Sequence, residues 1–400
     1  MLNNFDSDSF IRLQINEIKS VLKGSKAMIA CSGGVDSTTC AVLTHKAIGD
    51  NLQCVFLDTG FMREGEPERV VETFRKPPLN LPIKLVDVPE RFIKAISDRH
   101  DAEDKRKTFR ALFYQVLSEQ ANLERCTFLV QGTIAADVIE TKGGIKTQHN
   151  VLEQIGINTV ESYGFKVIEP LVKLYKEEVR QVARKLEIPS YVSERQPFPG
   201  PGLSVRVVGN LNKEKLNILK KATEVVEKVF AEKDAQQYFA AILPDHKVDL
   251  SETQTLVDMV ADILHLPQES IIGAFLNSKA TGVRHNDRVY GNVFCITIRE
   301  YTGSLFKPDF ELLLKLQHSL TNKLSTLSRV LYRTSKEERI GEYIIVIRAI
   351  ATKDFITASP LQIDWKTVTD ASEKILWLDE RISSVYYDIT SKPPGTIEFE

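Results

Sequence analysis

Hydrophobic residues in the first half of the chain occur either at helical spacing or in short continuous runs. Apolar positions recur every three or four residues over residues 10–22, which predicts a helix that Gly24 ends. Four buried strands are predicted from the continuous runs, at residues 27–31, 53–57, 83–88 and 127–130. Helices are predicted between and after them, at residues 36–47, 67–75, 90–97, 103–121 and 174–186. This alternation indicates an α/β fold with a doubly wound parallel sheet, covered by helices on both faces.

The second half of the chain has a different pattern. Alternating or β-branched runs predict strands, at residues 205–208, 238–243, 289–298, 343–350 and 385–389. Helices are predicted at residues 213–232 and 364–379, so the second half is expected to form a smaller α+β domain. The stiff run QPFPGPG at 196–202 marks the boundary. We therefore expect a first domain over residues 1–193 and a second over 194–400.

Three segments interrupt these patterns. Residues 137–160 have no clear period and indicate either a functional lid or a misassigned element. Two stretches of the second domain are predicted to be insertions, at about 245–277 and 300–341. The first opens with Ser251 and Gln254 in a capping-box pattern, and the second carries a leucine stripe that predicts a helix over 308–331. Such stripes are typical of core or subunit contacts.

Composition and charge exclude several classes of protein. With 42% hydrophobic and 26% charged residues, the chain is neither disordered nor fibrous. The net charge of −2 provides no general field for nucleic acid. The five cysteines include no CxxC pair, and three lie in apolar runs, which indicates buried thiols and a reducing, cytoplasmic compartment. The sequence also has no signal peptide at its start and no uncharged apolar stretch long enough to span a membrane.

One motif, SGGVDS at residues 32–37, carries clear chemistry. It lies between a predicted strand and a predicted helix, where backbone N–H groups and the helix N-terminus make an anion site. The hydroxyls of Ser32, Ser37 and Thr38 could donate to phosphate oxygens. The segment has no P-loop lysine, and Asp36 suits such a site if Mg²⁺ joins its carboxylate to phosphate. The alternative is a structural turn in which Asp36 is only a helix N-cap.

The SGGVDST segment resembles the PP-loop of the ATP pyrophosphatases, enzymes of adenine nucleotide alpha hydrolase-like fold that split ATP between its α and β phosphates. Several families share that loop, but further segments resemble the GMP synthetase family in particular. They include QGTI at 131–134, DVIE at 137–140, GIKT at 144–147, IEPL at 168–171, PFPGPGL at 197–203 and TSKPPGTIE at 390–398. No glutaminase domain precedes the PP-loop, so the chain resembles the synthetase subunit of the two-subunit form.

The resemblance implies a reaction with two nucleotides. Xanthosine 5′-monophosphate (XMP) would be adenylated at its C2 oxygen by ATP, with Mg²⁺ as cofactor and release of pyrophosphate. Ammonia from a separate glutaminase subunit would then displace AMP and give GMP. The resemblance also implies a homodimer formed through the second domain. We expect neither nucleic acid nor a membrane among the partners.

The resemblance also implies site residues. ATP would be bound by Ser32, Gly33, Gly34, Val35, Asp36, Ser37 and Thr38. Leu57 is a candidate for adenine contact because ligands bind at the carboxyl ends of such strands, where Asp58 and Arg63 follow. The implied catalytic residues are Asp36, which is also the metal ligand, and Lys146 in the lid. XMP would be bound by Arg195, Pro199, Gly200, Lys392, Thr396, Ile397 and Glu398.

The lid departs from the family pattern. Ala136 replaces a usual proline, Gln148 replaces the first of two histidines, and Leu152 begins a stretch that is usually glycine-rich. These departures bear on lid closure and on coupling to a glutaminase. Two other functions remain open: a nucleotide-binding regulatory paralogue with reduced turnover, and another PP-loop amide-forming ligase. Conversion of XMP to GMP with ammonium separates the three.

Overall fold

The computed structural model describes residues 5–142, 157–285, 287–353 and 356–400. Contacts divide the chain into two compact units. The first consists of Met1–Ala95 and Arg106–Pro201, and the second of Ile96–Lys105 and Gly202–Glu400. The second unit is therefore not the smaller of the two.

The first unit is built on a five-stranded sheet in the order β3-β2-β1-β4-β5. The central strand β1 (Ala27–Ala30) pairs with β2 (Leu52–Asp58) and β4 (Phe128–Val130). The edges are β3 (Ile83–Asp87) and β5 (Lys166–Ile168), and every pairing is parallel. The four predicted strands are confirmed. The fifth, β5, was not predicted because it is three residues long and only partly buried.

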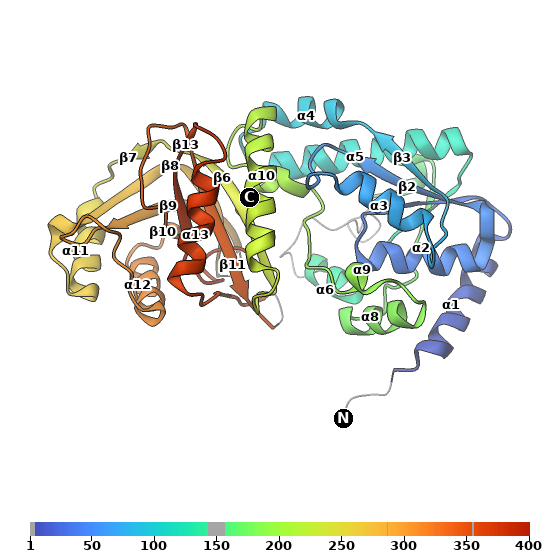
Figure 1. Ribbon diagram of the computed structural model, residues 1–400. Helices are drawn as coiled ribbons and strands as arrows, with labels where there is room; N and C mark the ends of the chain where they lie inside the picture. Colours follow the sequence, from blue (N-terminus) through green and yellow to red (C-terminus); the bar gives the residue numbers. More distant parts are fainter. Residues whose placement is uncertain (1–4, 143–156, 286, 354–355) are drawn as a thin grey trace. The chain divides into compact units, whose positions relative to one another are not determined.

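Helices cover both faces of this sheet, as the alternating pattern predicts. Figure 1 shows α2 (Val35–Ile48) and α3 (Glu66–Arg75) on one side and α4 (Pro89–Ser97) and α5 (Ala102–Glu124) on the other. The remaining helices are α1 (Ser7–Leu22), α6 (Ala135–Lys142), α7 (Thr159–Tyr163), α8 (Lys176–Lys185) and α9 (Ser190–Ser193). The segment predicted to be a lid thus begins and ends in helices, while residues 143–156 lie outside the described part. A doubly wound parallel α/β fold is confirmed.

The second unit contains a mixed eight-stranded sheet. Seven strands follow the order β12-β11-β13-β10-β9-β8-β7, and β6 pairs with β11. Their bounds are β6 (Gln237–Pro244), β7 (Lys247–Val248), β8 (Ile271–Arg284), β9 (Asp287–Ile298), β10 (Leu327–Arg333), β11 (Tyr343–Ala351), β12 (Ser359–Pro360) and β13 (Ile382–Asp388). Strands β6, β9, β11 and β13 are confirmed. The strand predicted at 205–208 is wrong, because Gly202–Arg206 forms a 3₁₀ helix and Val207 makes only an isolated bridge to Ile242.

Four helices accompany this sheet: α10 (Lys213–Phe230), α11 (Thr253–Leu264), α12 (Phe310–Lys323) and α13 (Trp365–Leu376). The helix predicted over 308–331 is wrong in its second half. It ends at Lys323, and the last leucine of the stripe, Leu327, begins the fully buried strand β10. The capping box at Ser251 is also wrong, because Glu252 is the N-cap of α11 and its side chain makes no capping bond.

The cysteines lie in the packed interior. Cys31, Cys40, Cys54, Cys126 and Cys295 all lie in the described part of the chain, and each is a buried free thiol. Burial raises the pKa of the Cys31 and Cys40 thiols well above the ordinary value, so neither is a ready nucleophile. None of the helices in the described ranges is long and apolar enough to cross a membrane.

Candidate functional site

The order of the first sheet determines where a ligand can bind. From β1 the chain continues to β2, on one side of the β1–β4 pair, and from β4 it continues to β5, on the other side. The loops that follow β1 and β4 therefore diverge above the carboxyl ends of these strands. The two loops nevertheless pack closely at their base. A Cβ on Gly132 would lie 3.0 Å from the carbonyl carbon of Asp36 and from the backbone nitrogen of Ser37. This glycine therefore permits the loop after β4 to lie directly against the SGGVDS loop.

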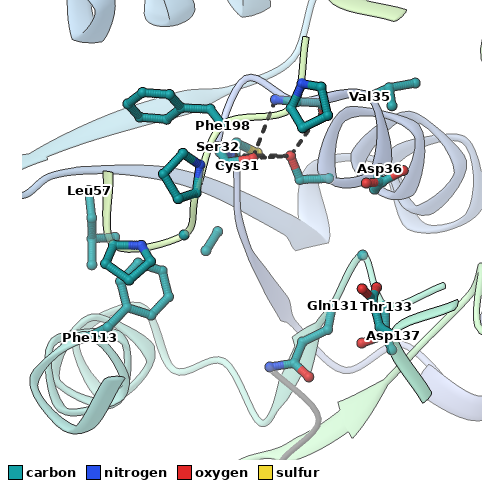
Figure 2. Close-up of a pocket in the computed structure, with 18 of the residues that line it drawn as sticks. Cys31, Ser32, Val35, Asp36, Leu57, Phe113, Gln131, Thr133, Asp137 and Phe198 are labelled. Carbon is teal, nitrogen blue, oxygen red and sulfur yellow. Dashed lines mark hydrogen bonds between the residues drawn. The ribbon is translucent and has the colours of Figure 1, made fainter. Parts of the chain in front are cut away.

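A cavity of about 460 Å³ opens at this point of the first unit. Figure 2 shows Leu57 and Phe113 toward one end of it and Asp36, Thr133 and Asp137 toward the other. Phe56, Leu117 and Leu129 are further apolar lining residues. The cavity thus combines an apolar part, suited to a ring system, with a polar part beside the SGGVDS loop.

The SGGVDS loop leaves the N-terminus of α2 open. Gly33 has a φ of +76°, and Gly34 is the N-cap of α2 without a side-chain capping bond. Asp36 is therefore not the N-cap, so that part of the alternative interpretation is wrong. The first N–H groups of an uncapped 14-residue helix, together with its dipole, make a site for an anion.

The loop hydroxyls hold the turn together. Ser37 Oγ accepts from Ser32 N at 3.2 Å and lies 3.1 Å from Ser32 Oγ. Both serines line the cavity. Thr38 does not: it is fully buried, and its hydroxyl donates to Gly34 O at 2.8 Å. The prediction that the Thr38 hydroxyl donates to phosphate is therefore not supported.

Asp36 is paired with a lysine that no sequence motif marks. Lys176 Nζ lies 2.6 Å and 2.8 Å from the two carboxylate oxygens of Asp36, and both residues line the cavity. Lys176 is the first residue of α8, the helix that follows β5. Since β5 lies beside β4, the strand order brings Lys176 to the loop. Because β5 was not predicted from the sequence, Lys176 could not be placed beside Asp36.

A second charged group lies beside the loop, centred on the buried carboxylate of Glu66. Arg195 Nη2 pairs with Glu66 Oε1, and Arg63 donates its backbone N–H to Oε2 at 3.0 Å. The Arg63 side chain lies 3.4 Å from the same carboxylate and stacks on the ring of Phe198 at 4.1 Å. Burial would raise the pKa of Glu66, but the charges of Arg63 and Arg195 outweigh it and lower that pKa. One carboxylate thus orients two guanidinium groups.

Replacing Glu66 with glutamine is expected to lower the free energy of unfolding by about 3 kcal/mol, because it leaves two guanidinium groups without their shared anion. The pKa of Glu66 is lowered in the folded state, so its stabilisation is complete above the ordinary value of 4.5 and is lost as the pH falls toward the lowered value. Urea unfolding should therefore show a constant difference from wild type at neutral pH that narrows below pH 4.5. Glu72→Gln, on the exposed face of the same helix, should show almost no difference.

The structure brings most of the predicted ATP-site residues to one cavity, together with predicted XMP-site residues of the 195–200 segment, which was expected in the second domain but lies in the first unit. Ser32, Gly34, Val35, Asp36, Ser37, Leu57, Arg195, Pro199 and Gly200 all line it. Gly33 contributes the turn, and a Cβ there would lie 3.5 Å from Arg195 Nη1. Lys146, with Gln148 and Leu152, lies outside the described residues. Ala136 lies in α6, partly buried against the core of the first unit.

The four predicted C-terminal residues belong to the second unit. Both oxygens of Glu398 accept from Arg206, each at 2.9 Å, and Gln237 donates to the same carboxylate at 2.9 Å. Ile397 and Lys392 are partly exposed. Thr396 is nearly buried, and its hydroxyl bonds Thr281 and Arg329, so this hydroxyl serves the packing of the segment.

The described residues of the cavity suit a divalent metal that arrives with a phosphate ligand. No group of three His, Cys, Asp or Glu side chains that could hold a metal occurs in the ranges the structure describes. The Asp36 carboxylate is 29% exposed and faces the polar end of the cavity. One carboxylate beside nucleotide phosphates is the usual manner in which Mg²⁺ is held. The donor set therefore fits Mg²⁺ that enters with a nucleotide.

Comparisons with known proteins find similarity along the whole chain. A family model described as NAD synthase matches residues 6–266, and one described as GMP synthase C terminal domain matches residues 334–399. The chain is 42% identical to one subunit of the glutamine-hydrolyzing GMP synthase of Sulfurisphaera tokodaii, and 42% identical to the same subunit from Saccharolobus solfataricus. It is 36% identical to the same subunit from Methanocaldococcus jannaschii. Each alignment covers 99% of this chain and 100% of the relative.

Because each alignment covers 99% of the chain at 36–42% identity, we conclude that the chain belongs to this family of GMP synthase subunits.

Proposed function

We propose that the chain forms GMP from XMP, by ATP-dependent adenylation of the C2 oxygen followed by amination with ammonia. The observation that carries this proposal is the cavity at the switch point of the first sheet, which combines an uncapped helix N-terminus with Asp36 and Lys176. Full-length similarity to GMP synthase subunits supports the choice of substrate.

We place ATP in the cavity with its phosphates and its adenine at opposite ends. Its phosphates belong at the open N-terminus of α2, where backbone N–H groups and the hydroxyls of Ser32 and Ser37 lie. Its adenine belongs among the apolar residues near Leu57 and Phe113 (Figure 2). Lys176 would exchange its bond to Asp36 for a bond to a phosphate oxygen, which gives the ammonium group a role in neutralising the leaving pyrophosphate.

The chemistry needs positioning more than proton transfer. The C2 oxygen of XMP forms a bond to the α-phosphorus of ATP, and the bond from that phosphorus to the pyrophosphate breaks. Ammonia then adds to C2, loses a proton, and AMP departs with the former C2 oxygen. The amide-like oxygen of XMP is a poor leaving group until it carries the adenylyl group. Adenylation itself needs the two nucleotides held in line and the phosphate charge neutralised, and these two effects provide most of the rate.

Asp36 is the residue that would hold Mg²⁺ beside the phosphates. When bound, the metal neutralises phosphate charge and makes pyrophosphate a better leaving group. Asp36 itself orients Lys176 and keeps the polar end of the cavity charged. Lys146 is proposed as a second cation for the phosphates, on the resemblance of its IKT segment alone.

The proposed XMP contacts come from two segments. Arg195, oriented by Glu66, is suited to a phosphate because a guanidinium group donates two parallel hydrogen bonds. The backbone at Pro199 and Gly200 would lie along the same ligand. In the C-terminal segment, Glu398 is proposed to accept from purine N–H groups, since a carboxylate held by Arg206 retains further lone pairs. Lys392 is proposed to meet the nucleotide phosphate.

An assay of the purified chain with XMP, ATP, Mg²⁺ and ammonium tests the proposal. GMP and pyrophosphate should appear in equal amounts, and neither should appear without XMP. Binding of both nucleotides without GMP formation would identify a regulatory paralogue. Cleavage of ATP regardless of XMP would identify another PP-loop ligase.

Two partners are part of the proposal. The relatives are named as one subunit of a glutamine-hydrolyzing synthase, which supports a separate glutaminase as the source of ammonia for this chain. We also propose that the second unit forms a homodimer. Sedimentation equilibrium of the full chain should give twice the mass of the monomer, and a monomer at micromolar concentration would contradict the dimer.

A further inference from the structure

Two fully buried arginines in the second unit donate hydrogen bonds to the backbone of the C-terminal segment. Arg329, on β10, and Arg348, on β11, are each 0% exposed. Both donate to one carboxylate oxygen of Asp388, which is also 0% exposed, at 3.1 Å and 2.6 Å. Charged side chains are rarely buried completely, because the free energy of desolvation must be offset by ion pairs and hydrogen bonds.

Both guanidinium groups also donate to the chain just after residue 395, in addition to bonds from Arg329 to Thr281 O and from Arg348 to Thr390 O. Arg348 donates from Nε to Ile397 O and from Nη2 to Thr396 O, both at 2.9 Å. Arg329 Nη2 donates to Glu398 O at 2.6 Å and to the Thr396 hydroxyl at 2.8 Å. Three consecutive backbone carbonyls, those of residues 396–398, are therefore bonded to arginines. We call Arg329, Arg348 and Asp388 the arginine clamp.

Neighbouring contacts hold the two residues that follow the clamped carbonyls. The ring of Phe399 lies under the Arg329 guanidinium at 4.5 Å and belongs to the core of the unit. Glu400 is fully buried, accepts from Gly209 N at 2.9 Å, and pairs with Lys105. A terminal segment is ordinarily frayed, so this number of buried bonds indicates a segment held in one conformation.

The side chain of Glu398, the last residue with a clamped carbonyl, contacts a different set of groups. Glu398 gives its backbone carbonyl to Arg329, while its carboxylate is held by Arg206 and Gln237 and stays 16% exposed. The backbone and the side chain of Glu398 are thus held by different residues. Loss of the clamp would free the backbone without removing any group that faces a ligand.

We propose that Arg329, Arg348 and Asp388 are positioning residues for XMP recognition, acting by fixing the backbone of residues 396–398 so that Glu398 is presented in a single orientation. The proposal rests on the proposed function, in which Glu398 binds XMP. A preformed site avoids the loss of affinity that accompanies ordering a loose segment on binding. The clamp is therefore expected to determine the affinity for XMP and not the chemical step.

The test uses Arg348→Lys in the full chain, with Arg333→Lys as its matched control. Lysine keeps the charge but cannot donate in the three directions of the guanidinium group. Arg333 is equally buried on β10, but it bonds Glu338 and Ser335 O instead of the C-terminal segment. Steady-state kinetics with saturating ammonium would give KM for XMP, KM for ATP and kcat for each protein.

For Arg348→Lys we expect KM for XMP to rise on the order of tenfold or more, while kcat and KM for ATP stay within about threefold of wild type. Amide hydrogen exchange at residues 396–400 should accelerate in this variant and not in Arg333→Lys. An unchanged KM for XMP with accelerated exchange, or an equal rise in both variants, would overturn the proposal. Absence of GMP formation by the wild-type chain would instead refute the proposed function.

A second pair of variants keeps the test valid if Arg348→Lys fails to fold. Thr396→Val removes the hydroxyl that bonds Arg329 Nη2, whereas Thr396→Ser retains it. We expect KM for XMP to rise several-fold in the valine variant and to return to within about twofold of wild type in the serine variant. Equal KM values in these two variants would contradict the role of the clamp.

Discussion

Replacing Asp36 with alanine is expected to lower the rate of pyrophosphate release on the order of 10³-fold, because one substitution removes the proposed metal ligand and the partner of Lys176. The side chain is only partly buried and packs no core, so the fold should persist. Release of pyrophosphate would be followed in a coupled assay with XMP and ammonium at saturation. The melting temperature should stay within a few degrees of wild type.

The asparagine variant and a surface control sharpen this test. Asp36→Asn keeps the shape of the side chain and removes its charge, so it should be nearly as inactive as Asp36→Ala if charge is what matters. Asp8→Ala removes an exposed carboxylate that also pairs with a lysine, Lys185, and should leave the rate unchanged. Wild-type rates in either Asp36 variant would remove its role at the phosphates.

Replacing Gly33 with alanine is expected to weaken ATP binding on the order of 10²-fold. Gly33 has a φ of +76°, and a Cβ there would lie 2.7 Å from Val70 Cγ2, a buried side chain of α3. The loop must move to relieve this contact, which misplaces the N–H groups at the start of α2. Isothermal titration with ATP and Mg²⁺ measures the effect directly.

Gly24→Ala is the matched control for this substitution. Gly24 also has a left-handed φ, +83°, but no atom lies within 4 Å of the position of its Cβ. Both variants should lose about 1 kcal/mol of stability from backbone strain, and only Gly33→Ala should lose ATP affinity. Equal affinities in the two variants would show that the geometry of the loop is not needed for ATP.

The first sheet and its loop could be predicted from the sequence because their signals are local. β1, β2 and β4 are continuous apolar runs, and the glycines at 33 and 34 follow β1 at once. Parallel strands align their carboxyl ends, so Leu57 and the loop could be placed at one edge. Lys176 and Glu66 could not be found, since their roles depend on β5 and on the packing of α3, which no local pattern shows.

The second sheet was predicted less completely for a physical reason. β10 lies between β9 and β13 and all seven of its residues are buried, so it lacks the alternation that marks a half-exposed strand. Its Leu327 also continues the helical spacing of α12, which placed it in a helix. No sequence pattern marks the arginines of β10 and β11, which the structure buries against the C-terminal segment.

The central claim is that the C2 oxygen of XMP attacks the α-phosphorus of ATP, and an oxygen label tests it most directly. XMP carrying ¹⁸O at C2 would be converted with ammonium, and the products separated and analysed by mass spectrometry. The account predicts one ¹⁸O in the phosphate of AMP and none in pyrophosphate. Label in pyrophosphate or in water, with unlabelled AMP, would contradict it.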